Sequence, residues 1–280
     1  MSLIVHHLTA GPTAAPLLVS HATGFHALAY RTMADELAHR FDAWGHDSRG
    51  HGSTVAPADW TVDWRGYGDD ALAASSWLVE RSGTDGELVG FGHSMGGATL
   101  LMAALRRPGL FRALVLYEPI VFPPIDGMAG LDPADSPLTQ GARRRRGVFG
   151  SYAEAIDNYR SKPPMNAFDL RALDDYVRGG FRPVDPSDPD GAVELTCTPA
   201  HEAATFAGSH ASGLWALVPT ITTPTLVVGG HPADTNPPSL MAEPVAEMLP
   251  NGRYLETHLD HFGPFVDPAA VAGMVREFTA

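Results

Sequence analysis

Val89-Gly-Phe-Gly-His-Ser-Met-Gly-Gly97 is the stretch from which the architecture of this chain can be inferred. A short apolar run, 87–91, leads into it, and an Ala/Leu/Met-rich run, 98–107, follows at once. At its centre is the pattern Gly-x-Ser-x-Gly around Ser94, which in a strand–turn–helix setting is typical of a nucleophile elbow. Such a turn strains the serine backbone and raises the hydroxyl above the carboxyl edge of a sheet. The simpler explanation is a glycine-rich turn with a helix-capping serine, and the rest of the chain distinguishes the two.

Short apolar runs alternate with helical patterns through the first half of the chain. The expected strands are 3–8, 16–20, 42–46, 87–91 and 113–117, and the expected helices are 27–41, 63–82 and 98–107. Alternation resumes towards the C-terminus, with expected strands 224–230 and 253–257, a helix at 240–249, and a last helix starting at Asp267-Pro268. Short apolar runs joined by helices are typical of buried parallel strands. The pattern predicts an α/β fold with a doubly wound, mostly parallel sheet.

The alternation stops between about Val121 and Val218. Proline-rich joints separate helical pieces at 152–159 and 169–178 in this part of the chain. Such a composition suits an inserted, mostly helical cap rather than more sheet. We therefore expect a core of residues 1–120 and 219–280 and an inserted helical cap of residues 121–218. Aromatic side chains of this segment are expected mainly in its own core, with some lining an acyl pocket.

Composition excludes several classes of function. The net charge of −13 argues against nucleic acid or an anionic membrane as a partner, and the one basic run, 143–146, is expected to be a solvated helix face. The single cysteine, Cys197, excludes a disulfide framework and fits a reducing cytoplasm. We see no signal-peptide pattern and no apolar run long enough to span a bilayer. Dinucleotide, phosphate-loop and zincin patterns are missing, so neither cofactor nor metal is expected.

Four motifs resemble those of the α/β-hydrolase superfamily, over essentially the whole chain. They are His21-Ala-Thr-Gly, Asp47-Ser-Arg-Gly-His-Gly-Ser53, Gly92-His-Ser-Met-Gly-Gly97 and His261-Phe-Gly-Pro. Each follows the strand after which that superfamily places it. The resemblance implies a serine, acid and histidine triad in that chain order, with a cap inserted after the sixth strand. It does not imply a substrate, because this fold hosts many activities.

The serine needs a base in hydrogen-bond reach, and His261 is the expected base because its loop follows the last strand. His258 is the rival nearby, but it lacks the Phe-Gly-Pro context. The resemblance implies that the backbone N–H groups of Met95 and Thr23 form the oxyanion hole. Ala22 stands where the superfamily usually has glycine, so Gly24 or Phe25 could donate in place of Thr23.

Three side chains beside these motifs are expected to contact the substrate. Phe25 follows the oxyanion motif, Phe262 follows the expected base, and His93 precedes the expected nucleophile. For His93, packing under the elbow is the other explanation.

Two carboxylates compete for the role of triad acid. Asp234 comes one or two residues late for the usual Gly-x-x-Asp turn, in a stretch where an aspartate is readily explained as a turn former. Glu118 ends an apolar strand, where a buried carboxylate needs a partner such as an imidazole N–H. Some haloalkane dehalogenases carry their acid in a setting similar to Tyr117-Glu118-Pro119. The sequence favours Glu118, with Asp234 as the alternative acid and a cap-anchoring salt bridge as the alternative role of Glu118.

These residues favour a cofactor-independent serine hydrolase that cleaves a small or medium carboxylic ester, lactone or thioester through an acyl-enzyme. A carbon–carbon bond hydrolase and a cofactor-free perhydrolase are alternatives with the same fold. A ligand receptor of low turnover is the alternative from another class. Ser94 counts against haloalkane dehalogenases and epoxide hydrolases, which use an aspartate at the elbow. The expected partner is a small molecule, and monomer and homodimer both remain open.

Overall fold

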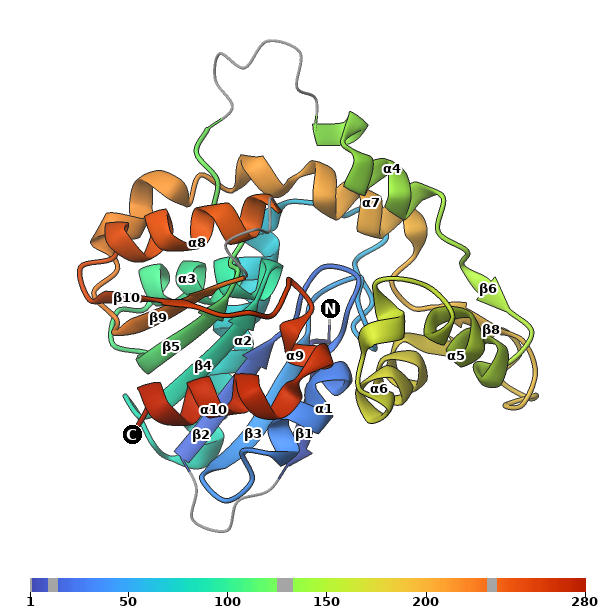
Figure 1. Ribbon diagram of the computed structural model, residues 1–280, viewed down its shortest axis with the longest axis horizontal. Coiled ribbons are helices and arrows are strands. Elements are labelled where there is room, and N and C mark those ends of the chain that lie inside the picture. The colour runs from blue at the N-terminus through green and yellow to red at the C-terminus, as the bar shows by residue number, and fades with distance from the viewer. Residues whose placement is uncertain (1, 10–14, 125–132, 231–235) are drawn as a thin grey trace.

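The computed structural model describes residues 2–9, 15–124, 133–230 and 236–280, and a seven-stranded sheet lies at its centre (Figure 1). The strands run in the spatial order β1-β3-β2-β4-β5-β9-β10. β1 pairs with β3 in the antiparallel sense and every other neighbouring pair is parallel, which confirms the predicted sheet. The strands are β1 (Ile4–Thr9), β2 (Ala15–Ser20), β3 (Phe41–Asp47), β4 (Leu88–His93), β5 (Phe111–Tyr117), β9 (Thr225–Gly229) and β10 (Gly252–Glu256).

Helices cover both faces of this sheet, as Figure 1 shows. On one face lie η1 (Ala27–Tyr30), α1 (Arg31–Asp35), α9 (Gly263–Val266) and α10 (Pro268–Phe278), and on the other lie α2 (Trp64–Ser82), α3 (Met95–Arg106) and α8 (Pro237–Met248). Successive strand residues point to opposite faces, so Leu17 and Val19 join one hydrophobic cluster and Leu18 the other. The central strands β2, β4, β5 and β9 are therefore buried on both faces, which explains their mostly apolar sequences.

Two helices begin where the sequence predicts, and a third is shorter than predicted. Asp63 caps α2 by accepting from the Arg65 N–H, and α10 starts at Pro268 directly after its capping residue. The helix expected at 27–41 is instead η1, the short α1 and a series of tight turns. The turns at 34–40 are closed by i→i−3 hydrogen bonds, which carry the same buried side chains into the core without an α-helix.

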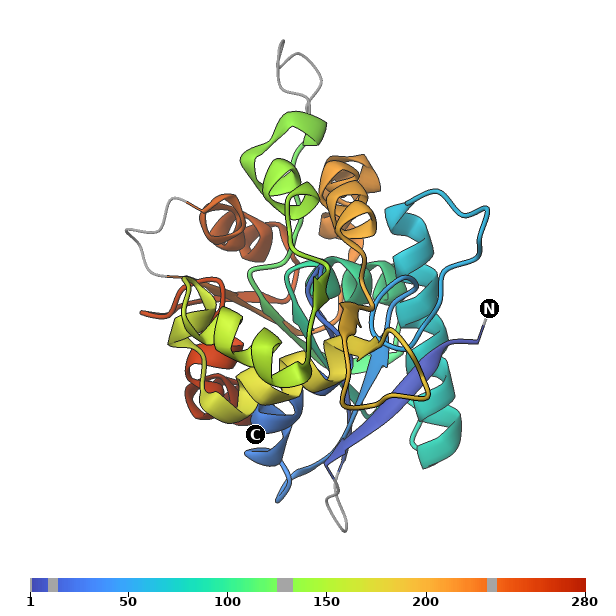
Figure 2. The same ribbon diagram turned by 90° about the vertical axis from the view of Figure 1, so that its right-hand side faces the viewer.

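Residues 121–218, as far as they are described, are mostly helical and are here called the lobe; Figure 2 shows part of this segment in front of the sheet. The lobe contains η2 (Pro133–Asp135), α4 (Pro137–Arg143), α5 (Tyr152–Arg160), η3 (Met165–Ala167), α6 (Leu170–Gly180), α7 (Pro199–Ala207), η4 (Ser209–Ser212) and η5 (Trp215–Thr220). It also contains a small antiparallel sheet of β6 (Val148–Phe149), β8 (Val193–Leu195) and β7 (Phe181–Pro183). This sheet is absent from the sequence prediction, because strands of two or three residues show no periodicity.

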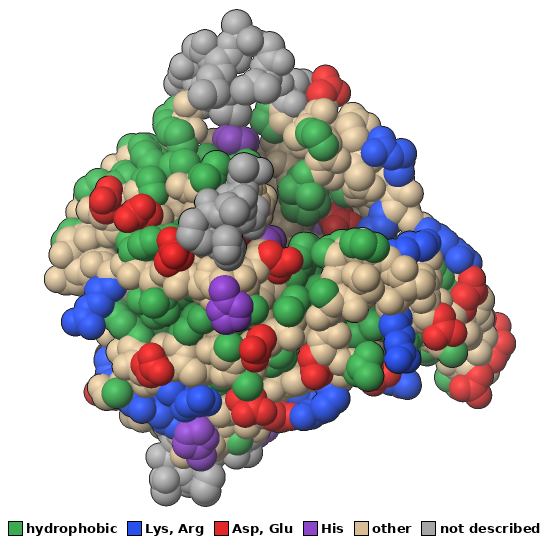
Figure 3. Space-filling model, in the orientation of Figure 1, with side chains coloured by type: hydrophobic (Ala, Val, Ile, Leu, Met, Phe, Trp, Pro, Cys, Tyr) green, Lys and Arg blue, Asp and Glu red, His purple; other side chains and the backbone are tan. Residues whose placement is uncertain are grey.

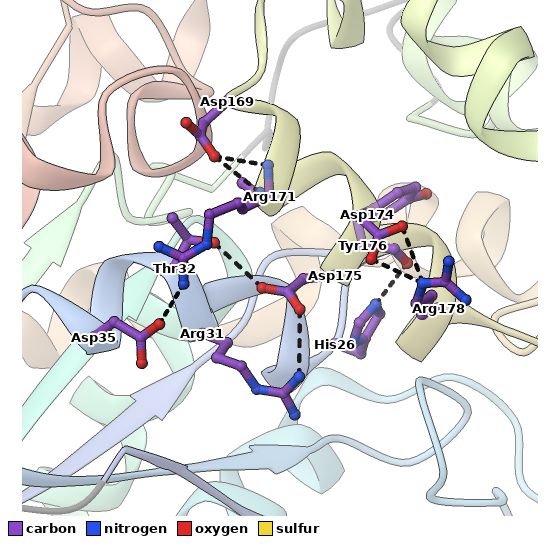
Figure 4. A network of polar contacts seen from close by, with 11 residues as sticks. His26, Arg31, Thr32, Asp35, Asp169, Arg171, Asp174, Asp175, Tyr176 and Arg178 are labelled. Carbon is purple, nitrogen blue, oxygen red and sulfur yellow. Dashed lines mark hydrogen bonds and ion pairs between the residues drawn. The ribbon is translucent and has the colours of Figure 1, made fainter.

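The α6 helix joins the lobe to α1 through the polar network in Figure 4. Asp175 accepts from Arg31 Nη1 at 3.3 Å and from Thr32 Oγ1 at 3.2 Å, and Arg171 pairs with Asp35 at 2.5 Å. These charged groups are partly exposed, so their hydrogen-bond geometry fixes the position of α6 more than their charges stabilise it.

A buried histidine and the α7 helix complete the connection. His26 Nε2–H donates to the Tyr176 carbonyl at 2.9 Å, and burial lowers the pKa of His26 to about 4. At the other side of the lobe, Trp64 Nε1–H donates to the Thr205 carbonyl at 2.9 Å, and Tyr67 OH bonds Thr205 Oγ1 at 2.7 Å. The lobe is thus tied to the core through both α6 and α7.

Candidate active site

Ser94 stands at a sharp turn between β4 and α3. Its backbone has φ 56° and ψ −116°, a conformation that only a few non-glycine residues adopt and that clusters at functional sites. Neighbouring backbone groups hold it there, because the Ser94 N–H donates to the Tyr117 carbonyl at 2.9 Å and its carbonyl accepts from Ile120 at 3.1 Å. A Cβ on Gly96 would lie 1.9 Å from the Ser20 carbonyl oxygen, so only glycine allows this close passage. The local geometry is that of a nucleophile elbow.

Glu118 occupies the equivalent place on the neighbouring strand. It follows β5 directly, has φ 44°, and is fully buried. Its Oε2 lies 2.5 Å from His261 Nδ1, and its backbone N–H donates to the Val228 carbonyl at 2.9 Å. Within the described part of the chain, its Oε1 accepts no hydrogen bond. A buried carboxylate against an imidazole nitrogen is the arrangement that orients a catalytic histidine.

Two side chains from the ends of the same strands hold the loop that carries His261. Tyr117 OH donates to the Asp260 carbonyl at 2.8 Å, and His93 Nε2–H donates to the next carbonyl, that of His261, also at 2.8 Å. His93 and Tyr117 are register partners in β4 and β5. His93, which precedes Ser94, and Tyr117, which precedes Glu118, therefore fix the backbone of the loop that carries His261.

His93 is fully buried and both of its ring nitrogens bind protein groups. Because a carbonyl can only accept, the proton sits on Nε2, and Nδ1 accepts from Tyr30 OH at 2.8 Å. Tyr30 OH in turn accepts from the Ala22 N–H at 3.1 Å. Burial lowers the pKa of His93 well below its usual value, so the ring is neutral. This geometry makes His93 a link between the His261 loop and the Ala22 loop, as its packing under the elbow implies, and a contact with the substrate stays a prediction.

Hydrogen bonds in the loop after β2 distinguish the candidate oxyanion donors. The Phe25 N–H donates to the Ala22 carbonyl at 3.1 Å and is therefore not available to an oxyanion. Among the residues with described positions, the N–H groups of Thr23 and Met95 donate to no protein acceptor. Both N–H groups are therefore available to an oxyanion, and their role as its donors stays a prediction.

Phe25 and Phe262 belong to an aromatic wall shared by the core and the lobe. The Phe25 ring stacks on Phe265 with centroids 4.6 Å apart and lies 4.9 Å from the ring of Tyr176, which comes from α6. Phe262 is partly exposed, with its ring 5.6 Å from the ring of His261 and 5.7 Å from that of Phe168. An apolar surface of this kind, next to the histidine, suits an acyl chain or an aromatic group.

The Asp47–Ser53 motif has a structural part in this arrangement. The Asp47 carboxylate accepts from the Ala27 N–H at 2.9 Å and from the Ser53 N–H at 2.7 Å, and it pairs with His6 Nε2 at 2.8 Å. A Cβ on Gly52 would lie 2.2 Å from the same carboxylate. Asp47 thereby ties the loops after β2 and β3 together beneath the site.

Asp234, the alternative acid, lies outside the described residues. In the part of the chain that is described, no three His, Cys, Asp or Glu side chains gather as a metal site would require. No helix among the described ranges has the length and apolar character needed to cross a membrane.

The chain belongs to the alpha/beta hydrolase family, whose model matches residues 17–274. Its sequence is similar to mouse (Mus musculus) monoglyceride lipase, with 32% identity over 40% of this chain and 37% of that protein. It is similar also to lipase LipV of Mycobacterium tuberculosis, with 34% identity over 43% of this chain and 44% of that protein. The chain thus spans less than half the length of these relatives.

Solved structures carry the same fold. That of E-2-(acetamidomethylene)succinate hydrolase superimposes with a TM-score of 0.76, covering 99% of this chain and 94% of that one at 20% sequence identity.

Proposed function

We propose that this protein is a serine hydrolase that cleaves small or medium carboxylic esters, lactones or thioesters through an acyl-enzyme. The observation that carries the proposal is the 2.5 Å contact between buried Glu118 Oε2 and His261 Nδ1, at the same sheet edge as the strained Ser94. The lipase names of its relatives support an ester substrate. We assign Ser94 as nucleophile, His261 as general base and Glu118 as the orienting acid.

In the proposed reaction, Ser94 Oγ attacks the substrate carbonyl while His261 Nε2 takes its proton. Glu118 holds the ring by its Nδ1–H and stabilises the imidazolium that forms. The N–H groups of Thr23 and Met95 donate to the oxyanion of the tetrahedral intermediate, a contribution worth roughly 3 kcal/mol per donor in other serine hydrolases. His261 then protonates the leaving alcohol, and the same histidine activates the water that releases the acid.

We further propose that residues 121–218 act as a cap that sets substrate size. The support is that α6 contributes to the aromatic wall beside His261 and that both α6 and α7 are fixed to the core. Substitution of Phe168 should therefore change the preferred acyl length more than it changes the rate of Ser94 phosphonylation. A length preference that follows core-loop residues instead would contradict this role.

The test is a turnover screen over esters, lactones and thioesters of graded acyl length, with Ser94→Ala as the blank. Multiple turnovers on p-nitrophenyl butyrate distinguish an enzyme from a receptor of the same fold, whereas fluorophosphonate labelling alone does not. A carbon–carbon bond hydrolase or a perhydrolase would give slow ester turnover, and faster reaction with a β-diketone or with peroxide.

The acid is tested by two isosteric changes, Glu118→Gln and Asp234→Asn. We expect Glu118→Gln to lower kcat by roughly 10³- to 10⁴-fold with the fold retained, because the amide cannot orient and charge-stabilise the imidazole. Asp234→Asn should keep kcat within about threefold of the parent, because the proposal gives Asp234 no part in the reaction. The reverse pattern would reassign the acid to Asp234.

A further inference from the structure

One arginine of the basic run 143–146 does not form the solvated face expected from the sequence. The side chain of Arg145 is only 17% exposed, and its Nη1 donates to Glu202 Oε2 at 2.8 Å. Its Nη2 donates to the hydroxyls of Tyr159, at 3.1 Å, and Tyr176. These partners come from α7, α5 and α6, so Arg145 lies at the centre of the lobe.

The Arg145–Glu202 pair touches the loop that carries the proposed oxyanion donor. A Cβ on Gly24 would lie 2.3 Å from Glu202 Oε1 and 3.4 Å from Arg145 Nη1. Gly24 directly follows Thr23, whose N–H is proposed to bind the substrate carbonyl oxygen. The Arg145–Glu202 pair therefore contacts the next residue of that loop. Figure 3 shows a hollow between the core and the lobe, with hydrophobic side chains around it and charged ones at its far end.

A purely structural role leaves part of this pair unexplained. Burying two charges costs several kcal/mol per ion, and well-packed apolar residues in their place are often as stable or more so. The surrounding lobe core is already aromatic. Moreover, Glu202 Oε1 accepts no hydrogen bond from any described residue, and it is not one of the fully enclosed unpaired atoms. The pair therefore presents a free acceptor towards the oxyanion loop.

We propose that Glu202, held in place by Arg145, is a specificity group that binds a hydroxyl or amide N–H donor of the substrate. The charges of the pair cancel, so it attracts neither a carboxylate nor an ammonium strongly, and a carboxylate would meet Oε1 with like charge. A neutral donor near the scissile bond is the group that the free oxygen accepts best. The inference rests on the proposed ester hydrolysis and narrows it to polar, hydroxyl- or amide-bearing substrates.

The test uses ester pairs that differ by one hydroxyl. They are 2-hydroxyethyl butyrate against propyl butyrate, and p-nitrophenyl 3-hydroxybutyrate against p-nitrophenyl butyrate. In at least one pair, kcat/KM should be roughly 10- to 100-fold higher for the hydroxyl ester, the range for a hydrogen bond to a charged group. Equal kcat/KM in both pairs would overturn the proposal, as would a higher kcat/KM for p-nitrophenyl hydrogen succinate than for either hydroxyl ester.

The decisive variant is Arg145→Met combined with Glu202→Leu, which keeps the side-chain volume and removes both charges. The preference for the hydroxyl ester should fall to about one in this variant. The matched control is Arg182→Met with Glu194→Leu, an ion pair of the same lobe that is 59% and 35% exposed. The control should keep the preference of the parent.

If the double variant does not fold, Glu202→Asp serves instead, because it keeps the negative charge near Arg145 and withdraws the oxygen by one methylene. A folded variant that retains the full hydroxyl preference would contradict the role of Glu202. Failure of the underlying hydrolase assignment has a different result, namely a parent protein that turns over none of the four esters and whose Ser94 is not phosphonylated.

Discussion

Gly230→Ala is expected to disturb the proposed triad although none of its three members is substituted. Gly230 follows β9, and a Cβ built on it lies 2.4 Å from Glu118 Oε1, 2.9 Å from Ser239 Oγ and 3.1 Å from the Leu259 carbonyl oxygen. Real Cβ atoms almost never approach other atoms within 3.0 Å, so the groups of Glu118 and Ser239 must shift to admit the methyl group. The softest neighbour is the Glu118 carboxylate, which must retreat by at least roughly 0.6 Å.

That retreat stretches the 2.5 Å bond between Glu118 Oε2 and His261 Nδ1. Complete loss of an orienting acid costs about 10⁴-fold in kcat, and a misplacement of about 1 Å costs about 10²-fold. We therefore expect kcat on p-nitrophenyl butyrate to fall roughly 100-fold, which corresponds to about 2.7 kcal/mol of transition-state stabilisation. Overpacking should also lower the free energy of unfolding by about 1–3 kcal/mol.

Gly273→Ala is the matched control. Gly273 lies in α10, where the nearest atom to an added Cβ is 3.7 Å away, so the change should raise helix stability slightly and leave kcat unaltered. Steady-state kinetics and thermal unfolding of both variants provide the comparison. A folded Gly230→Ala protein with kcat within threefold of the parent would refute the reasoning, because Glu118 would then not orient His261.

Two further predictions concern the loop that carries His261 and the stability in acid. Tyr117→Phe removes the donor to the Asp260 carbonyl, so we expect kcat to fall about tenfold and KM to change little, and an unchanged kcat would show that this bond does not position the base. Burial lowers the pKa of His21, His26 and His46 from 6.5 to about 4, so the unfolded chain binds more protons between those pH values. The stabilisation that comes from the neutral rings is therefore fully present above pH 6.5. As the pH falls towards 4, the free energy of unfolding should decrease by about 3 kcal/mol per histidine. Urea unfolding from pH 7.5 to 4 tests this, and a flat profile would contradict it.

The parts of the site that lie within a few consecutive residues could be inferred from the sequence. The glycines around Ser94 predict a strained turn, and the structure has a φ of 56° at that residue. The φ of 44° at Glu118 is not predicted, since its place at the end of an apolar strand before Pro119 carries no such signal. Capping residues such as Asp63 also indicate where helices begin, because a cap involves only residues close together in the sequence.

Features that depend on contacts between distant residues could not be inferred. The place of His93 in the network depends on Tyr30, 63 residues away, which no local pattern reveals. Within the basic run, the sequence does not distinguish Arg145 from its neighbours, because burial depends on where α7 places Glu202. The series of turns after α1 shows the apolar spacing of a helix, so its periodicity misled the prediction of a helix at 27–41.

Ser94 and Glu118 each follow one member of the register pair His93 and Tyr117. The spacing of β4 and β5 therefore sets the distance between the proposed nucleophile and the proposed acid. Neighbouring strands lie about 4.8 Å apart wherever a sheet forms, so the separation of nucleophile and acid does not depend on any loop length. Residues 121–218 come after β4, β5 and Glu118 in the sequence and end before β9 begins, so they do not interrupt these two strands. The lobe can accordingly be exchanged or redesigned for new substrates while the spacing of the reacting groups stays constant.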